Sequence, residues 1–398
     1  MTLVVALSLA VALVVVPMAL YLGVLALLAR ADGTPPFARP VRKFMVVVPA
    51  HNEALQISDT VRSVLAVDYP PHLREVVVVA DNCTDATAAV ARSAGARVLV
   101  RDDLEHQGKG FALAHAFADV LAQSDADAVA VVDADTVVSS NLLYAFAARL
   151  AAGAHAVQAE YGVRNPDVSW RTRLMTVALA MFHRTRSLAR ERLRLSVGLR
   201  GNGMCFSRQL LATRPYDAFS LVEDVEYGIA IALAGYRVAY AGEARVLGEM
   251  AASGRGAATQ RRRWEHGRWT LARALLPKLA REAVRKRSSM LADLALDLAV
   301  PPVSFLGVAV GVGLTLEGIV WTGLGAPSAA FYLWLVALVS LVLYAARGVQ
   351  HSGLGWRALA ALGWAPLYVA WKLVILAPRF RPRVWVRTQR EAEKQISG

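Results

Sequence analysis

The stretch from residue 2 to residue 29 contains no charged side chain. A helix needs about 20 apolar residues to cross a bilayer, so this stretch is long enough to span one. It lacks the basic leading segment of a signal peptide, although Ala29-Arg30-Ala31 has some likeness to a cleavage site. We therefore expect residues 1–30 to form a transmembrane helix that stays attached to the chain.

Three further apolar stretches lie toward the C-terminal end. Residues 298–316 and 327–346 are uncharged. Residues 356–378 are a weaker candidate, because polar and aromatic residues such as Lys372 interrupt them. The chain is 56% hydrophobic, above the roughly 45–50% typical of soluble proteins. We assign residues 291–378 to a C-terminal transmembrane region.

Basic residues flank these apolar stretches and account for much of the net charge of +13. Because positively charged flanks stay in the cytosol, the pattern places the N-terminus outside and the central region inside. The basic tail, residues 379–398, is expected in the cytosol too. An even number of spans must then follow the central region, which favours an interfacial or re-entrant role for residues 356–378. In the cytosol, Cys83 and Cys205 are expected to be free thiols.

The central region carries three continuous Val-rich runs, at residues 44–50, 75–80 and 127–132. Runs without alternation are typical of strands buried on both faces, hence of a parallel sheet. Helical patterns lie between the runs, at about 53–66, 84–94 and 109–123. This alternation predicts an α/β domain, in which ligands bind beyond the carboxyl ends of the strands.

Acidic or amide residues follow each run: Asn52 and Glu53, then Asp81, then Asp133 and Asp135. Taken singly, these positions also fit helix caps or solvated turns. Taken together, they place three polar strand ends at one edge of a sheet. Two carboxylates two residues apart can share a Mg²⁺ ion that keeps waters and substrate phosphates as further ligands. The sequence thus points to a metal-bound nucleotide diphosphate.

A glycine-flanked lysine, Gly108-Lys109-Gly110, opens the third helical pattern. Backbone N–H groups and an ammonium group at a helix start can hold an anion, although a plain flexible turn is the alternative. The spacing is not that of a Walker A loop, and no G-x-G-x-x-G follows the first run. Both the P-loop and the Rossmann dinucleotide site are therefore disfavoured.

An ordered set of motifs resembles the membrane-integrated branch of the family 2 glycosyltransferases, which includes cellulose, chitin-oligosaccharide and hyaluronan synthases and ceramide glucosyltransferases. The motifs are VVVPAHNE, ADNCTD, GKGFAL, DAD, GNGMCFSR, VED and QRRRW. The resemblance implies a GT-A fold: an α/β domain with a mostly parallel central sheet, embedded between transmembrane helices. This catalytic domain would occupy residues 41–255, with interfacial helices at 256–290.

The resemblance also implies roles for the matching positions. Contacts to the nucleotide sugar would come from Pro49, Ala50, Asn52, Glu53, Asp81, Lys109 and Asp133. Asp133 and Asp135 would hold Mg²⁺ or Mn²⁺. Asp224 would be the general base of an inverting transfer, with Glu223 as its rival and a possible acceptor contact. The Q-x-x-R-W motif, Gln260, Arg263 and Trp264, would complete the catalytic set.

Two segments are expected near the acceptor or the membrane. The resemblance gives a loose acceptor-site role to Gly201, Asn202, Gly203 and Met204. Residues 168–197 combine arginines with apolar positions, which predicts a basic amphipathic helix at the membrane surface. On helical spacing, the Q-x-x-R-W residues share one face, while Arg261, Arg262, Glu265 and Arg268 would turn toward water or lipid headgroups.

The implied activity is a metal-dependent hexosyl or N-acetylhexosaminyl transfer from a UDP-sugar. The acceptor would be a polysaccharide or oligosaccharide extended through a β-linkage; the alternative is single addition to a lipid such as a ceramide or diacylglycerol. A non-catalytic nucleotide-binding protein is the remote alternative. We expect a multi-pass protein of a bacterial inner membrane, surrounded by lipids, with accessory secretion or biosynthesis proteins as partners. Nucleic-acid binding is disfavoured, because the basic residues flank membrane spans.

Overall fold

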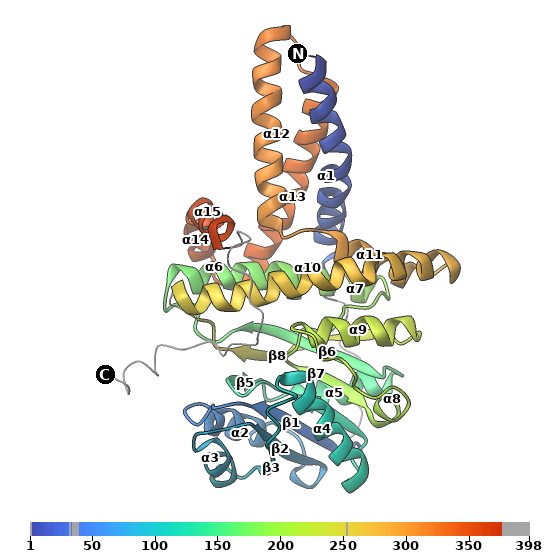
Figure 1. Ribbon diagram of the computed structural model, residues 1–398, viewed down its shortest axis with the longest axis vertical. Coiled ribbons are helices and arrows are strands. Elements are labelled where there is room, and N and C mark those ends of the chain that lie inside the picture. The colour runs from blue at the N-terminus through green and yellow to red at the C-terminus, as the bar shows by residue number, and fades with distance from the viewer. Residues whose placement is uncertain (1, 32, 34–39, 252–253, 376–398) are drawn as a thin grey trace.

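The computed structural model describes residues 2–31, 33, 40–251 and 254–375. The predicted basic tail, residues 379–398, lies outside the described residues. Figure 1 shows a body built on a β-sheet, a long helix lying across one end of it, and a bundle of helices that projects beyond. The N-terminal end of the chain lies at the far tip of this bundle.

The sheet has eight strands in the order β3-β2-β1-β4-β7-β6-β8-β5. Its strands are β1 (Phe44–Ala50), β2 (Arg74–Asp81), β3 (Arg97–Arg101), β4 (Ala128–Val131), β5 (Thr136–Val138), β6 (Ala156–Val163), β7 (Met204–Ser207) and β8 (Val238–Gly248). Strands β3, β2, β1 and β4 are parallel, whereas β7 runs antiparallel to both of its neighbours. Strand β8 is parallel to β6 and antiparallel to β5, so the sheet is mixed in its second half.

Helices cover both faces of the sheet. They are α2 (Ile57–Leu65), α3 (Thr87–Ser93), α4 (Lys109–Gln123), α5 (Leu142–Ala151), α8 (Arg208–Thr213) and α9 (Glu223–Leu233), with a 3-10 turn η1 (Pro71–Leu73). Helices α2, α3 and α5 bury one apolar core, while α4, α8 and α9 bury the other. The three Val-rich runs are β1, β2 and β4, as predicted, because their side chains are buried on both sides.

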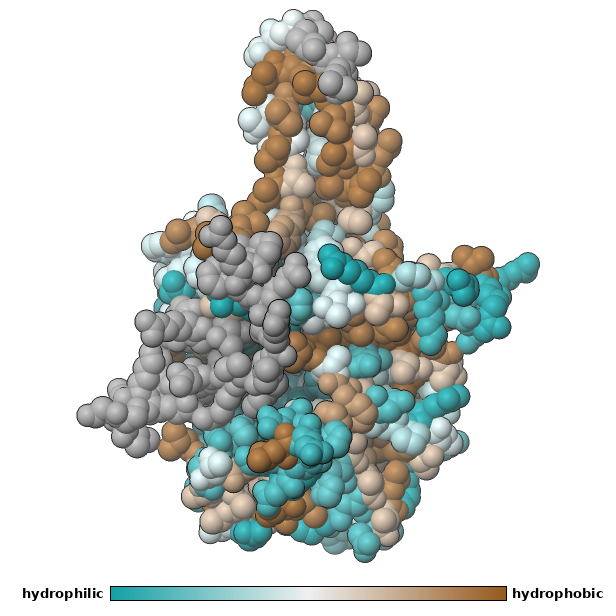
Figure 2. Space-filling model, in the orientation of Figure 1, coloured by the Kyte–Doolittle hydropathy of each residue, from teal (hydrophilic) through white to brown (hydrophobic). Residues whose placement is uncertain are grey.

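Among the described residues, three helices are long and apolar enough to cross a membrane: α1 (Thr2–Leu28), α12 (Val303–Leu324) and α13 (Ala329–Ser352). They pack on one another around a shared apolar core, and apolar side chains dominate the visible face of this bundle in Figure 2. Span α12 begins at Val303, later than the predicted boundary at 291, because Pro301 and Pro302 separate it from helix α11 (Ser289–Ala299).

Residues 356–378 do not form a continuous span. Their described part folds into two short helices, α14 (Trp356–Leu362) and α15 (Ala365–Ile375), which lie at the base of the bundle in Figure 1. At about 1.5 Å of rise per residue, neither helix is long enough to cross about 30 Å of hydrocarbon. The predicted interfacial role therefore fits their length.

The predicted amphipathic helix at 168–197 is a broken helix: α6 (Trp170–Leu179), a π-helical turn η2 (Ala180–Thr185) and α7 (Arg186–Arg192). Three arginines of this broken helix form ion pairs inside the protein and do not face lipid. Arg184 pairs with Glu160, Arg186 with Asp297 and Arg190 with Asp293 and Asp297. That part of the prediction is wrong, because carboxylates remote in the sequence neutralise these arginines inside the protein.

Candidate active site

A cavity of about 660 Å³ lies between the carboxyl ends of β1, β2 and β4 and the helices next to the membrane bundle. Its position follows the rule for α/β sheets, and its volume suits a small-molecule site. Thirteen of the predicted site residues line it: Pro49, Ala50, Glu53, Asp81, Lys109, Asp133, Asp135, Gly201, Glu223, Asp224, Gln260, Arg263 and Trp264.

Lys109 lies at the centre of the polar end of this cavity. It is the first residue of α4, and its ammonium group pairs with Asp133 and donates to the Gly201 carbonyl at 2.6 Å. Burial alone would lower the pKa of Lys109, but the carboxylates of Asp133, Glu223 and Asp224 outweigh burial and raise it. The lysine therefore stays charged among these acids.

The turn between β4 and β5 presents Asp133 and Asp135 to the cavity. Thr136, at the start of β5, pairs with Gly248 of the antiparallel strand β8. Asp135, which precedes β5, therefore lies opposite Glu249, which follows β8. Both residues line the cavity. Glu249 was not predicted, although it follows a strand as the other site acids do. Carboxylate oxygens of this kind suit Mg²⁺ or Mn²⁺.

Glu223 and Asp224 open helix α9, where acidic residues favour the positive end of the helix dipole. Burial, and then the neighbouring charge of Asp224, raise the pKa of Glu223 to about 7. Burial also raises the pKa of Asp224, against the attraction of Lys109. An ideal Cβ on Gly201 would lie 3.4 Å from the Asp224 carboxylate, so Gly201 and Asp224 are neighbours. A carboxylate with a raised pKa is suited to accept a proton.

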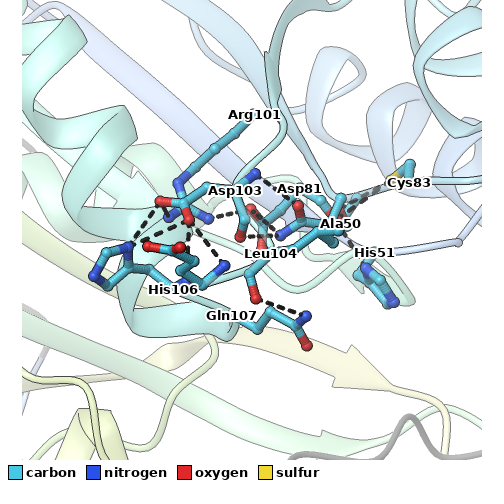
Figure 3. A network of polar contacts seen from close by, with 11 residues as sticks. Ala50, His51, Asp81, Cys83, Arg101, Asp103, Leu104, His106 and Gln107 are labelled. Atoms are coloured by element: carbon cyan, nitrogen blue, oxygen red, sulfur yellow. Dashed lines mark hydrogen bonds and ion pairs between the residues drawn. The ribbon is translucent and has the colours of Figure 1, made fainter.

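Asp81, at the end of β2, belongs to a polar network shown in Figure 3. Arg101 pairs with Asp81 at 2.6 Å and with Asp103 at 2.8 Å. His51 contacts the Asp81 carbonyl at 2.8 Å, and Asn82 accepts a hydrogen bond from the Asp103 backbone at 2.8 Å. This network holds the loop after β3 against the strand ends. His51 and Asn82 also line the cavity, and neither was singled out from the sequence.

Four predicted site residues do not line the cavity. Asn52 accepts the Thr84 N–H at 2.7 Å. Asn202 is fully buried, accepts the Asp133 N–H at 3.1 Å and donates to Thr136 at 2.8 Å. Gly203 packs on a core valine and Met204 is buried in β7. Asn202 holds the turn that carries Asp133, and the structure gives no support to acceptor contacts from Asn202, Gly203 or Met204.

Helix α10 (Gly254–Arg285) carries the Q-x-x-R-W residues. The predicted division into a site face and a water face is wrong for Glu265 and Arg268, because α15 and α11 cover these positions. Glu265 is buried and pairs with Lys372 of α15 at 2.6 Å. Arg268 donates to the Asp297 and Val300 carbonyls. Arg261, Glu265 and Arg268 line the same cavity as Gln260 and the motif tryptophan.

The cavity continues from the sheet edge to the base of the membrane bundle. Apolar residues of α12, α14, α15 and the preceding loop line this second end: Pro301, Pro302, Val303, Leu362, Ala365, Tyr368 and Val369. Helix α12 contributes Val303 and Ser304 to this lining, and α13 contributes Tyr344 and Ala345. These residues lie toward the helix ends that face the β-sheet body. The sequence contained no short motif for this end, because its residues come from separate helices.

Comparisons with known proteins give one family and one fold. The family model described as glycosyltransferase like family 2 matches residues 40–267. A mannosyltransferase, PcManGT from Pyrobaculum calidifontis, solved with GDP-Man and Mn²⁺, is 20% identical and covers 87% of this chain and 98% of its own, with a TM-score of 0.56.

Glucosyl-3-phosphoglycerate synthase from Mycobacterium tuberculosis, solved with Mn²⁺, UDP and phosphoglyceric acid, is also similar in structure. It is 24% identical and covers 59% of this chain and 78% of its own, with a TM-score of 0.38. No curated protein sequence matches this chain.

Proposed function

We propose a reaction from one premise: this chain belongs to the glycosyltransferase-like family 2. Its fold is the GT-A fold, with a mixed sheet and candidate transmembrane helices at the N-terminal end and in the C-terminal region. The proposed activity is an inverting transfer of one sugar from a nucleoside diphosphate sugar to an acceptor hydroxyl at the membrane surface, which forms a β-linkage. The family resemblance favours UDP as the nucleotide.

The proposed chemistry assigns one role to each end of the acid cluster. The acceptor oxygen bonds to the anomeric carbon as the bond from that carbon to the diphosphate oxygen breaks. The electron pair leaves with the nucleoside diphosphate, and the hydroxyl proton passes to Asp224. Lys109 and Arg263 would stabilise the growing charge on the diphosphate, as preorganised cations do in such sites. Trp264 would support the sugar.

The residues at the sheet edge fit a divalent metal ion. Asp133 and Asp135 offer hard oxygen ligands in the cavity, and substrate phosphates and waters would complete the shell. Lys109 pairs with one oxygen of Asp133, and the Thr136 hydroxyl donates to one oxygen of Asp135 at 3.2 Å, so the metal ion would share both carboxylates with these groups. When bound, the metal supplies Lewis-acid stabilisation of the leaving diphosphate. The Mn²⁺ in the P. calidifontis mannosyltransferase supports this role.

Our proposal for the acceptor depends on the fact that the cavity is continuous from its acidic end to its apolar end. One space joins Asp224 to apolar residues at the base of α12 and beside α15. A lipid acceptor can place its hydroxyl at the base while its tail stays beside the bundle. The described spans pack around an apolar core and contribute only their inner ends to the cavity. We therefore favour single addition to a lipid over chain synthesis.

Saccharide chain synthesis is the second candidate. The aromatic rings of Trp264 and Phe219 line the cavity, and sugar rings commonly rest on such surfaces. The Q-x-x-R-W motif supports this candidate as well as the first. Both candidates use the same donor, metal ion and base, and they differ only in what occupies the second end of the cavity.

The three candidate spans and their charged flanks lead to a proposal for the side of the membrane on which the catalytic body lies. Arg30 follows α1, and Lys286 and Arg287 precede the C-terminal spans, which favours the cytosolic side for the catalytic body. Helices α12 and α13 then cross outward and return, so α14 and α15 lie on the catalytic side. The parity agrees with the even number expected from the charge pattern. We place the protein in a bacterial inner membrane, with accessory proteins as an added sequence-based proposal.

The test is direct transfer. Membranes that contain the full chain are incubated with a panel of radiolabelled UDP- and GDP-sugars and Mg²⁺ or Mn²⁺, and organic-soluble label is separated from long polymer. We expect label in the organic phase with one donor. Label in polymer instead would select the saccharide candidate, and no release of nucleotide from any donor would contradict the proposed activity.

A further inference from the structure

Three arginines from different elements converge on one aromatic ring in the cavity. The guanidinium carbons of Arg200, Arg186 and Arg268 lie 4.4, 4.8 and 5.7 Å from the ring centroid of Phe182. All four side chains line the cavity. Phe182 belongs to the π-helical turn η2, a type of irregularity that is common at functional sites. The arrangement concentrates positive charge between the base and the membrane bundle.

This arginine cluster holds more positive charge than its acidic neighbours neutralise. Arg186 and Arg190 share Asp293 and Asp297 in ion pairs. In the part of the chain that the structure describes, Arg200 and Arg268 form no ion pair with a carboxylate. Their hydrogen bonds go to backbone carbonyls instead. Together with Arg190, the cluster has four guanidinium groups, of which only Arg186 and Arg190 form ion pairs with carboxylates among the described residues.

The guanidinium group of Arg200 is only partly compensated by its surroundings. Its Nε is buried and has no hydrogen-bond partner among the described residues. Burial lowers the pKa of Arg200 to about 10, since Asp297 offsets only part of the effect of burial and of the nearby arginines. His183, also in the cavity, is kept neutral because burial and two arginines lower its pKa. A buried, partly unpaired guanidinium is costly unless an anion binds beside it.

The position of the arginine cluster indicates which of the two substrates would bring an anion to it. Arg200 precedes Gly201, the neighbour of Asp224, whereas Arg268 reaches the Val300 carbonyl just before span α12. The cluster therefore lies between the base and the apolar end of the cavity. The donor diphosphate has its own cation, Lys109, and its own acids at the sheet edge. An anion at the cluster belongs to the acceptor.

We propose that the acceptor is an anionic lipid, whose phosphate group binds Arg200 and Arg268 while its tail lies along the apolar end of the cavity. This inference rests on the proposed glycosyl transfer and narrows its acceptor. Planar guanidinium groups suit phosphate oxygens, because they donate two parallel hydrogen bonds. A hydroxyl next to the phosphate attacks the anomeric carbon and gives its proton to Asp224, and the phosphate itself keeps all its bonds.

The charge of the labelled product tests this inference. The full-length protein receives the donor selected by the panel and a total lipid extract from its source organism. The organic phase is then passed over an anion-exchange column calibrated with phosphatidylglycerol and diacylglycerol. Label retained with phosphatidylglycerol is the expected result. Label in the unretained, neutral fraction would overturn the inference, and a labelled phosphate compound confined to the aqueous phase would overturn its lipid part.

Variants locate the phosphate. We expect Arg200→Gln and Arg268→Gln to raise the KM for the lipid acceptor roughly 10- to 100-fold, the effect of losing a charge-assisted hydrogen bond. The KM for the nucleotide sugar should not change. Arg268→Lys keeps a charge and serves where Arg268→Gln does not fold. Arg273→Gln, at an exposed position of the same helix, is the matched control.

Two outcomes separate the inference from the proposed activity. If the variants keep the wild-type KM for the lipid, the arginine cluster is not the acceptor site, although the glycosyl transfer stands. If the wild-type protein neither transfers sugar nor releases nucleotide from any donor, the proposed function itself has failed. Donor hydrolysis without label in any lipid would leave the glycosyltransferase site intact and overturn the lipid acceptor.

Discussion

The two ends of one cavity carry opposite charge. At the sheet edge, Asp133, Glu223 and Asp224 lie around the ammonium group of Lys109, and Asp135 lines the same cavity. Toward the membrane bundle, arginines outnumber the carboxylates that pair with them. A metal ion and a sugar diphosphate together suit the first end, and an anion alone suits the second. Under the proposed reaction, this contrast would keep the two phosphate-bearing substrates at different ends of the cavity.

The ends also differ in how they are built. The acids of the first end follow β1, β2 and β4 or open a helix, so each is held by an element next to it in the chain. The second end depends on ion pairs between α7 and α11, such as Arg186 with Asp297, 111 residues apart. The first end is therefore set by local structure, and the second by how the body docks on the bundle.

The base at the acidic end gives the largest expected effect. Asp224→Asn should lower kcat by roughly 10²- to 10⁴-fold, the usual contribution of a general base, with nucleotide affinity unchanged. Initial rates and nucleotide binding of the purified full chain measure both quantities. Glu226→Gln, two residues further along α9, is the control and should retain activity. Full turnover by Asp224→Asn together with an inactive Glu223→Gln would move the base role to Glu223.

Loss of an arginine at the membrane-facing end of the cavity should lower the stability of the folded protein. Arg190→Met leaves the buried carboxylates of Asp293 and Asp297 short of a partner, which costs about 3–5 kcal/mol for a broken buried pair. We expect a lower melting temperature in detergent for the full chain. Adding Asp293→Asn should recover part of the loss, because it removes one stranded charge. An unchanged melting temperature in the single variant would mean that the ion pairs do not hold the two parts together.

Metal removal should affect only the acidic end. Chelation is expected to lower the transfer rate by about 10²-fold or more, because the diphosphate loses its Lewis acid. Asp135→Asn should raise the Mn²⁺ concentration needed for half-maximal rate, while the KM for the lipid stays constant. A metal titration of both proteins measures this. A rate that is insensitive to chelators would exclude the proposed metal role.

The pH dependence gives the smallest and most specific effect. The pKa of Glu223 is raised to about 7 by burial and by Asp224, so the acid pair takes up a proton below that pH. An inflection in the transfer rate is therefore expected near pH 7, and the rate should fall further at lower pH as Asp224, whose pKa burial also raises, takes up a proton. Ionising Glu223 also costs folding free energy as the pH rises toward 7.

Removal of one acid checks the cause of this profile. Glu223→Gln removes the group whose pKa is about 7, so the inflection near that pH should disappear. A profile that Glu223→Gln leaves unchanged would mean that another group sets it. Arg200→Gln should shift the fall in rate at lower pH toward higher pH, because Arg200 lowers the pKa of Asp224.

The sequence by itself determined the elements whose signals are local. Runs buried on both faces predicted β1, β2 and β4, uncharged stretches predicted the three spans, and residues after strands predicted most of the acidic end. The family resemblance implied a loose acceptor-site role for Asn202. Only the fold showed that its side chain holds the Asp133 backbone instead.

Only the tertiary structure decided the use of the arginines. A basic residue on a helix predicts a solvent or headgroup face, because sequence periodicity does not reveal which helix covers that face. Here Asp293 and Asp297 on α11 neutralise part of the charge of α7, and Lys372 of α15 covers Glu265 of α10. Charge compensation in a buried site depends on distances between remote elements, and these exist only once the chain is folded.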